Sequence, residues 1–322
     1  MLFSILRWSR MGSKKKDNQS VFRFAHFAMG TTFEVVTSGE EKTYASQASQ
    51  EVFNKIDRIE SLFSCFNPCS DIGQINRLKP GQSLRVGVET YECLKTASQI
   101  HSLTSGAFDV NIGSLAKPGK IANPKLEKMN PGRRQLQLDS SKSIGGFIVR
   151  IPEEQQSEYD VYGINLDLGG IGKGYALDKS INILSDWSIN NALIHGGTST
   201  ALAVGTALDG NSNKKGWPVG ISGDWECHRV PKKFYLRNRA LSSSGTEVKG
   251  EHIINPKTGA AAKENLAAWV SHPSATVADA LSTAFMVMST EEIKAFCDNN
   301  PEIWALIIID SNSYKTFNVD YL

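Results

Sequence analysis

The chain lacks long apolar runs, a surplus of one charge and a disulfide-type cysteine pattern, and each absence excludes a class of protein. No stretch has the length of a membrane-spanning helix, so we expect no membrane span. Charged residues make up 21% of the 322 residues and the formal net charge is +2, which argues against a nucleic-acid-binding surface. The five cysteines are an odd number in a long chain, so they indicate no disulfide framework and favour a reducing compartment.

The N-terminal residues differ from the rest of the chain. Residues 1–20 are predicted to be a disordered tail, and residues 21–322 a single domain, for which 40% hydrophobic residues supply an ordinary core. The apolar residues at 1–10 are too few and too interrupted for a signal-peptide core, and no small-residue cleavage site follows. We therefore expect a cytoplasmic protein, with a periplasmic or membrane-associated one as the alternative if the N-terminus is misassigned, for example if Met11 is the true start.

Hydrophobic periodicity predicts both helices and strands. Helical spacing covers residues 45–63, 91–104, 175–187, 275–288 and 291–298. Strand patterns cover residues 33–36, 165–168, 192–195, 200–204, 217–221, 240–242, 267–271 and 304–309. Residues 71–77 indicate a loop or a short helical turn, and residues 117–145 a surface excursion with one or two short strands. Strands and helices do not alternate strictly, which favours an α+β fold with largely antiparallel sheet.

The densest chemical signal is the segment 166–178, which reads LDLGGIGKGYALD. Its four glycines lie between a predicted strand and a predicted helix, where they let the backbone approach a ligand closely. The start of the following helix offers N–H groups and partial positive charge to a phosphate, and Lys173 adds a full charge. The spacing fits neither a P-loop nor the dinucleotide-binding fingerprint. The structural alternative is a tight strand-to-helix turn with a surface lysine.

A second signal is the segment 278–284, ADALSTA. Asp279 and Thr283 are four residues apart and share one face of a helix, with Ser282 beside them. A carboxylate, hydroxyls and backbone carbonyls are the hard oxygen ligands that suit Mg²⁺ bridging phosphates. The structural alternative is an Asp favoured by the positive end of the helix dipole, with a Thr packed below it.

A third signal is the segment 252–259, HIINPKTG, in which a histidine precedes a turn. His252 is a candidate general base or phosphate contact, because its ordinary pKa lies near neutrality. The alternative is a structural histidine at a strand end.

In this order along the chain, the segments resemble the ApbE family of FAD:protein FMN transferases. The resemblance covers roughly residues 25–310. It is carried by segments at 29–31, 63–72 with Asn76, 106–109, 167–178, 196–197, 244–245, 252–259 and 278–288. It implies an α+β fold, mostly of antiparallel sheets with helices, whose two lobes surround a flavin cleft.

The resemblance also implies a set of site residues. The Mg²⁺ site corresponds to Asp279, Thr283, Ser282 and the carbonyl of Gly170. His252, Asp279 and Lys173 form the expected catalytic set. The expected FAD contacts are Met29, Phe66, Ala107, Phe108, Asp109, Lys173, Asp178 and Ile254. Phe66 stands where many members have Tyr, and Ser282 at a position that can be Asp.

The implied activity is Mg²⁺-dependent transfer of the FMN moiety of FAD to a Thr or Ser hydroxyl of an acceptor flavoprotein subunit, with release of AMP. Two alternatives stay open. Water could replace the acceptor, which would make the protein a Mg²⁺-dependent FAD pyrophosphatase. The chain could also bind or store FAD without catalysis, a reading kept open by the departures at Ser282 and at Thr198, where an Asp or Asn is common.

Overall fold

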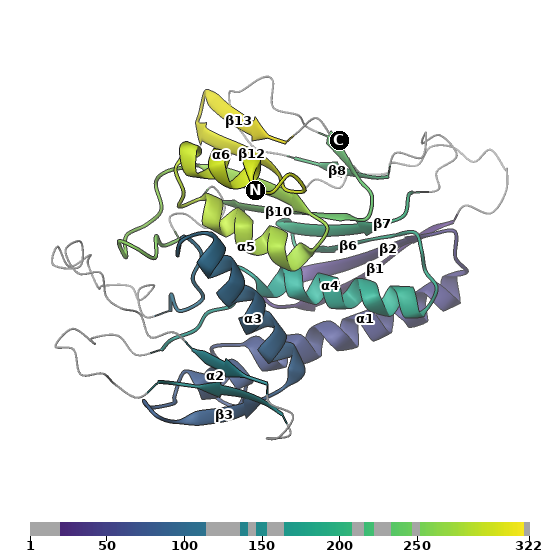
Figure 1. Ribbon diagram of the computed structural model, residues 1–322. Helices are drawn as coiled ribbons and strands as arrows, with labels where there is room; N and C mark the ends of the chain where they lie inside the picture. The colour runs from purple at the N-terminus through teal and green to yellow at the C-terminus, as the bar shows by residue number, and fades with distance from the viewer. Residues whose placement is uncertain are drawn as a thin grey trace.

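A single eight-stranded antiparallel sheet contains both the first and the last strand of the described residues (Figure 1). The computed structural model describes residues 20–113, 136–140, 146–152, 164–207, 216–221, 233–246 and 252–318, so the predicted tail, apart from Ser20, lies outside the described residues. The strand order is β1 (Val21–Ala28), β2 (Thr31–Ser38), β6 (Ala192–Gly196), β7 (Thr200–Val204), β10 (Arg239–Gly245), β11 (Ala267–His272), β12 (Trp304–Asp310) and β13 (Ser313–Phe317). β1 and β13, the first and last strands of the described residues, therefore belong to the same sheet.

Two smaller sheets flank the large one. The first has the order β3 (Ser83–Val86), β5 (Phe147–Arg150), β4 (Gln137–Asp139), and the second pairs β8 (Trp217–Gly220) with β9 (Lys233–Leu236). All paired strands in the described part of the chain are antiparallel, which confirms the predicted α+β fold.

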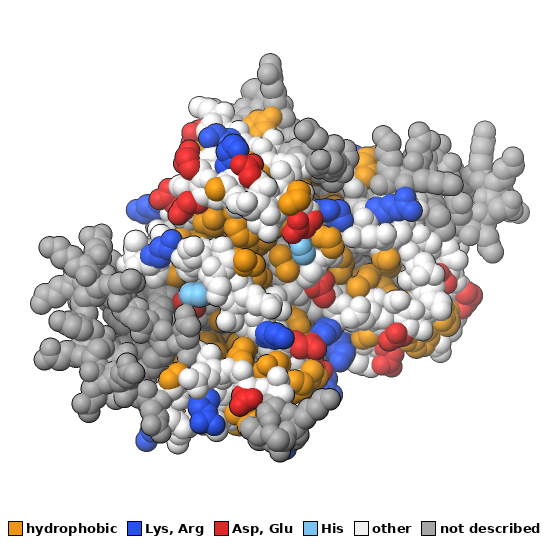
Figure 2. Space-filling view, in the orientation of Figure 1, with side chains coloured by type: hydrophobic (Ala, Val, Ile, Leu, Met, Phe, Trp, Pro, Cys, Tyr) orange, Lys and Arg blue, Asp and Glu red, His pale blue; other side chains and the backbone are white. Residues whose placement is uncertain are grey.

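Helices cover one face of the large sheet. α1 (Lys42–Phe63), α4 (Gly172–Asp186) and α5 (Ala275–Phe285) pack on its strands. α2 (Asp71–Ile75) contacts α1 and β3, α3 (Val88–Leu103) contacts α1, α5 and β5, and α6 (Thr290–Asp298) follows α5. α4 lies between α1 and α5, and α5 packs on β10 and β11 (Figure 1). A space-filling view of this side shows apolar side chains in several patches around α5, separated by charged ones (Figure 2).

The sheet is buried on both faces over its central strands. Residues such as Phe33, Ile194 and Ala268 face the helices, whereas Leu193, Leu241 and Trp269 face β8 and β9. Side chains alternate along a strand, so successive residues of β10 belong to opposite layers. Ala240 therefore joins the helical layer and Leu241 the layer under β8 and β9.

Most predicted elements are confirmed with shifts of a few residues at their ends, and one is wrong. The predicted strand 165–168 is not part of a sheet. Leu166 instead exchanges hydrogen bonds with the side chain of Asn76, which donates to its carbonyl at 3.0 Å and accepts from its N–H at 2.6 Å. Since a side-chain amide takes the place of a neighbouring strand there, the segment is extended without forming a ladder.

None of the helices in the described part is long and apolar enough to cross a bilayer.

Candidate active site

The glycine-rich turn meets the middle of α5 at Gly174 and Asp279. Gly174 lies in the first turn of α4, and its N–H donates to Oδ2 of Asp279 at 3.0 Å. A Cβ at position 174 would lie 2.2 Å from the carbonyl oxygen of Ala275 and 2.8 Å from Cβ of Asp279. Only glycine fits here, because the backbones of α4 and α5 approach each other more closely than a side chain allows.

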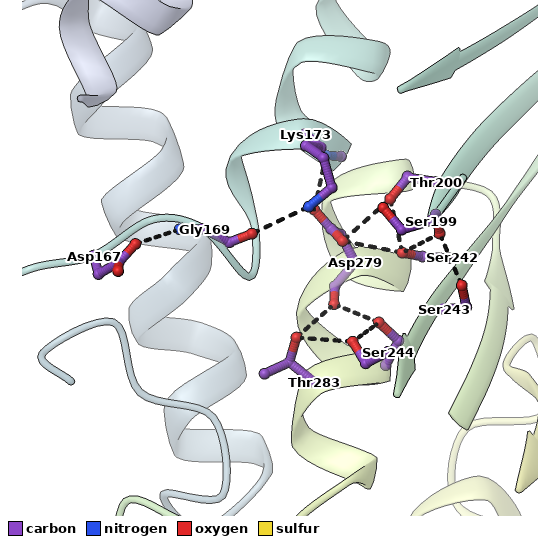
Figure 3. Close-up of polar contacts among 12 residues, drawn as sticks. Asp167, Gly169, Lys173, Ser199, Thr200, Ser242, Ser243, Ser244, Asp279 and Thr283 are labelled. Atoms are coloured by element: carbon purple, nitrogen blue, oxygen red, sulfur yellow. Dashed lines mark hydrogen bonds and ion pairs between the residues drawn. The ribbon is translucent and has the colours of Figure 1, made fainter. Parts of the chain in front are cut away.

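Asp279 is buried, with 2% exposure, and its carboxylate accepts several hydrogen bonds. Oδ1 accepts hydrogen bonds from Oγ of Ser242 at 3.0 Å and from Oγ1 of Thr200 at 3.2 Å (Figure 3). Nζ of Lys173 lies 3.9 Å from Oδ2. A buried carboxylate is costly unless it is paired and hydrogen-bonded, so these donors allow Asp279 to be a charged group inside the protein.

The buried thiol of Cys93, on α3, is influenced by the same charge. Burial, first, and the negative charge of Asp279, second, raise the pKa of this thiol far above its ordinary value of 9.0. Cys93 is therefore neutral at physiological pH and adds no negative charge to the site.

Three hydroxyls form a cluster one turn further along α5. Oγ of Ser244 lies 2.9 Å from Oγ of Ser282 and 3.2 Å from Oγ1 of Thr283 (Figure 3). Ser282 donates to the backbone carbonyl of Asp279 at 2.8 Å, and Thr283 is 3.4 Å from the same oxygen. β10 thus supplies a second row of polar groups to the helix face that carries Asp279.

Gly170 faces the same hydroxyls from the turn. A Cβ at position 170 would lie 3.1 Å from Oγ1 of Thr283 and 3.4 Å from a ring carbon of Phe108. The structure therefore brings five predicted site residues together: Gly170, Lys173, Asp279, Ser282 and Thr283, with Phe108 beside them.

The donor set fits a hard divalent cation. It consists of one carboxylate, hydroxyls and backbone carbonyls, which are ligands that Mg²⁺ takes together with several waters. Across the described residues, no group of three or more His, Cys, Asp or Glu side chains could hold a metal ion. A transition-metal site of the His/Cys type thus has no candidate there.

The turn offers fewer free N–H groups than its glycines suggested. The N–H of Gly169 donates to Oδ1 of Asp167, those of Ile171 and Gly172 donate to the carbonyl of Leu168, and that of Gly174 donates to Asp279. Lys173, whose Nζ also donates to the carbonyl of Gly169 at 3.2 Å, is therefore the main positive group of the turn.

The predicted contacts from residues 107–109 lie beside the turn. Ala107 and Phe108 are buried. Asp109 accepts from the N–H of Asn111 at 2.8 Å, and its Oδ2 lies 3.9 Å from Nδ1 of His101. The N–H of Asp167 donates to the carbonyl of Val110 at 2.8 Å, which fixes the two segments side by side.

Phe66 and its neighbours approach the turn from the end of α1. The Phe66 ring is 93% exposed. Burial and the charge of Asp167 raise the pKa of the adjacent Cys65 thiol, which places this loop near the start of the turn. An exposed aromatic ring at this position is available to stack on a ligand.

Three further predicted residues, Met29, Ile254 and His252, belong to segments other than those of the hydrogen-bonded cluster. Met29, with φ of 49°, and Gly30, with φ of 69°, form the two-residue turn of the β1–β2 hairpin, which needs positive φ at both positions. Ile254 forms an isolated antiparallel bridge with Ala261. His252 is exposed and lies two residues before Ile254.

The carboxylate of Asp178, a predicted FAD contact, anchors the N-terminus of α5. Oδ1 accepts from the N–H of Ala275 at 2.8 Å. Oδ2 accepts from Oγ of Ser274, the N–H of Thr276 and Oγ1 of Thr276, at 2.6–2.9 Å. The FAD contact stays a prediction, and the structure shows this other use of the side chain.

Sequence reasoning did not single out Thr200 and Ser242, the two hydroxyls on Asp279. Both are fully buried, Thr200 in the otherwise apolar strand β7 and Ser242 in the serine run of β10. A hydroxyl residue within a predicted strand was the available signal, although many such residues have no function.

Known proteins resemble this chain over nearly its whole length. The model of the ApbE family matches residues 29–307. The FAD:protein FMN transferase of Escherichia coli (strain K12) is 23% identical over 306 residues, which cover 90% of this chain and 84% of that protein. The FAD:protein FMN transferase of Treponema pallidum (strain Nichols) is 26% identical over 309 residues, 88% of this chain and 83% of that protein.

Solved structures share the fold. The flavinyl transferase ApbE of Pseudomonas stutzeri, in its apo form, superposes with a TM-score of 0.76 at 21% identity, covering 94% of this chain and 97% of that one. The ApbE protein of Thermotoga maritima gives a TM-score of 0.74 at 26% identity, covering 92% and 96%. With a family match over most of its residues, the chain belongs to the ApbE family.

Proposed function

We propose that this protein is a Mg²⁺-dependent flavin transferase, which moves the FMN moiety of FAD to a Thr or Ser hydroxyl of an acceptor flavoprotein and releases AMP. The observation that carries the proposal is the buried Asp279 carboxylate, which α5 presents to Lys173 and the glycine-rich turn. The names of the curated relatives support the same activity. We assign it to one domain, residues 21–322, since strands from β1 to β13 form one sheet.

Asp279, Thr283 and the carbonyl of Gly170 are the residues that would hold Mg²⁺. Their support is the proximity of Thr283 to both Asp279 and the Gly170 backbone. When bound, Mg²⁺ would neutralise the pyrophosphate of FAD and make AMP a better leaving group.

Lys173 is proposed to hold the phosphates in line for attack. Its ammonium group forms a long hydrogen bond to the carbonyl of Gly169, at 3.2 Å, and a long ion pair with the carboxylate of Asp279, at 3.9 Å. A long side chain between two acceptors can turn to a third, so Lys173 can contact a phosphate without leaving the site. Fixing the reacting groups in this way removes much of the entropic barrier to transfer.

The flavin half of FAD is proposed to contact Phe66, Phe108 and Ala107, with Met29, Asp109 and Ile254 around it. The support is the exposed Phe66 ring near the turn and the position of Phe108 beside Gly170. For Asp178 we propose a positioning role, because its two oxygens already accept four hydrogen bonds at the start of α5.

His252 is the proposed proton acceptor. In the reaction, the acceptor hydroxyl oxygen forms a bond to the FMN phosphorus and the bond from that phosphorus to the AMP oxygen breaks. The hydroxyl proton passes to His252, whose exposed position leaves it accessible to a second protein.

The experiment that tests the function incubates the purified protein with FAD and a candidate acceptor, in Mg²⁺ or in EDTA. Covalent flavin is followed by in-gel fluorescence, and AMP by chromatography. Fluorescent acceptor in Mg²⁺ alone supports the transferase. AMP release without labelled acceptor would replace it by the pyrophosphatase, and intact bound FAD with every acceptor would replace it by the storage protein.

A further inference from the structure

Ser244, Ser282 and Thr283 share their hydrogen bonds in a way that fixes the direction of each hydroxyl proton. A hydroxyl has one proton to donate, whereas a backbone carbonyl can only accept. Ser282 lies 2.8 Å from the carbonyl oxygen of Asp279, so its proton points there. In its 2.9 Å contact with Ser244, Ser282 must then be the acceptor, and Ser244 donates.

The direction of the Thr283 proton follows. Because the single proton of Ser244 is directed to Ser282, Ser244 can only accept in its 3.2 Å contact with Thr283. Thr283 therefore donates to Ser244, the nearer of its two acceptors, since the carbonyl of Asp279 is more distant at 3.4 Å. With its proton used in this bond, Thr283 has lone pairs on Oγ1 left for another group, and Gly170 is adjacent, because a Cβ there would lie 3.1 Å from Oγ1.

Ser282 itself is badly placed to bind a ligand. Its side chain is fully buried, its proton is directed to Asp279 and its oxygen accepts from Ser244. Thr283 is the more exposed of the two neighbouring hydroxyls.

We propose that Ser244 and Ser282 are positioning residues: they form a hydroxyl relay, from Thr283 through Ser244 and Ser282 to the carbonyl of Asp279, that orients the Thr283 lone pairs toward a divalent cation beside Gly170. The inference rests on the proposed function for the cation. It makes Ser282 a member of the relay and not a metal ligand, contrary to the expectation from sequence.

The test measures cation affinity directly, with Mn²⁺ as the probe and the loss of the free-Mn²⁺ electron paramagnetic resonance signal as the readout. Removing the outer hydrogen-bond partner of a metal ligand typically weakens affinity about 10- to 100-fold. We expect Ser244→Ala and Ser282→Ala each to weaken Mn²⁺ binding about tenfold. Ser244→Thr, which keeps the hydroxyl, should retain most of the affinity.

Ser243 provides the matched control. It is a serine of the same strand whose hydroxyl lies 3.4 Å from the carbonyl of Ser199, and it pairs with Trp269 on the opposite face of the sheet. Ser243→Ala should bind Mn²⁺ like the unsubstituted protein. Thermal unfolding without metal shows that each variant is folded.

The double variant separates a relay from an independent ligand. In a relay, losing either serine interrupts the same series of hydrogen bonds. The double variant Ser244→Ala/Ser282→Ala should therefore bind Mn²⁺ no more weakly than the single variant of lower affinity. Additive losses would show that Ser282 binds the cation itself and would overturn the relay, as would unchanged affinity in Ser244→Ala. Intact Mn²⁺ binding in a protein that transfers no FMN would overturn the proposed function alone.

Discussion

The N–H of Gly174 donates a 3.0 Å hydrogen bond to Oδ2 of Asp279, across 105 positions of sequence. This contact joins the turn that carries Lys173 to the helix that carries the hydroxyls. Since α4 and α5 also pack against each other, the polar groups of the site are fixed by the packing of two helices and not by a mobile loop.

Gly174→Ala should separate these helices. The new Cβ would lie 2.2 Å from the carbonyl oxygen of Ala275, which cannot move without shifting α5. We expect the free energy of unfolding to fall by at least about 1–3 kcal/mol, the usual cost of overpacking a tight contact, and transfer to be lost.

Gly172→Ala is the control for this substitution. Its Cβ would meet the Phe63 ring at 3.5 Å, an ordinary van der Waals distance, in the same turn of α4. Denaturant unfolding of both variants compares the two positions. Equal stability of the two variants would contradict the close-contact account.

Asp178→Ala should destabilise the protein in the absence of any ligand. The carboxylate accepts two backbone and two hydroxyl hydrogen bonds at the start of α5, so its removal leaves amides of the helix unsatisfied. We expect the free energy of unfolding of Asp178→Ala to fall by about 2 kcal/mol or more. The stability of Asp178→Asn should lie between those of Asp178→Ala and the unsubstituted protein, because its amide oxygen still accepts hydrogen bonds. A ligand-free stability equal to that of the unsubstituted protein, with weaker FAD binding, would instead support the contact to FAD.

Phe66→Ala should weaken FAD binding without changing stability. The ring is 93% exposed, so its removal uncovers no core. An aromatic stack contributes about 1–1.5 kcal/mol, which corresponds to a five- to tenfold loss of affinity. Titration of flavin fluorescence measures it, and Phe66→Tyr should bind like the parent. Unchanged affinity in Phe66→Ala would place the flavin elsewhere.

His272 should make stability depend on pH. Burial, first, and Arg239 lower its pKa below the ordinary 6.5, against the opposing effects of the Ser274 carbonyl oxygen, which lies 3.3 Å from Nδ1, and of Glu302 and Asp178. At a pH between the folded and unfolded pKa values of His272, the unfolded chain binds more protons than the folded one. The contribution of the neutral His272 ring to the free energy of unfolding is therefore fully present above about pH 6.5 and is lost as the pH falls through the lower folded pKa.

The structural consequence is at the N-cap of α5. Nδ1 of His272 accepts from the N–H of Ser274 at 3.0 Å, a bond that only the neutral ring can accept. Unfolding free energies at about pH 7.5 and about pH 5.5 should therefore differ less in His272→Asn than in the unsubstituted protein. An identical difference in both proteins would exclude His272 as a source of this dependence.

Local periodicity predicted the longer helices and many of the strands, whereas the strands β1, β3, β5, β9 and β13 were not predicted. The α1 helix was predicted from the helical spacing of Ala48, Val52, Ile56, Ile59 and Phe63, all of which are buried. The predicted strand at 165–168 was wrong because the partner of Leu166 is the Asn76 side chain, 90 positions away, which no local pattern reveals.

The candidate site was predictable only in part, for the same reason. Asp279, Thr283 and Lys173 lie in dense local motifs and were singled out, and the structure brings them together. Thr200, Ser242 and the relay through Ser244 depend on the packing of β7 and β10 against α5, so their burial and their partners appear only in three dimensions. The four hydrogen bonds that Asp178 accepts at the start of α5 likewise join residues far apart in the sequence, so no local pattern predicts them.

We propose that the buried Asp279 site cleaves FAD and passes its FMN half to a protein hydroxyl. The most direct measurement determines, in one reaction, the AMP released and the FMN bound to an acceptor by intact mass. We expect AMP and acceptor-bound FMN in equal amounts in Mg²⁺, and neither product with Asp279→Ala or in EDTA. Full transfer by Asp279→Ala, or AMP without a heavier acceptor, would contradict it.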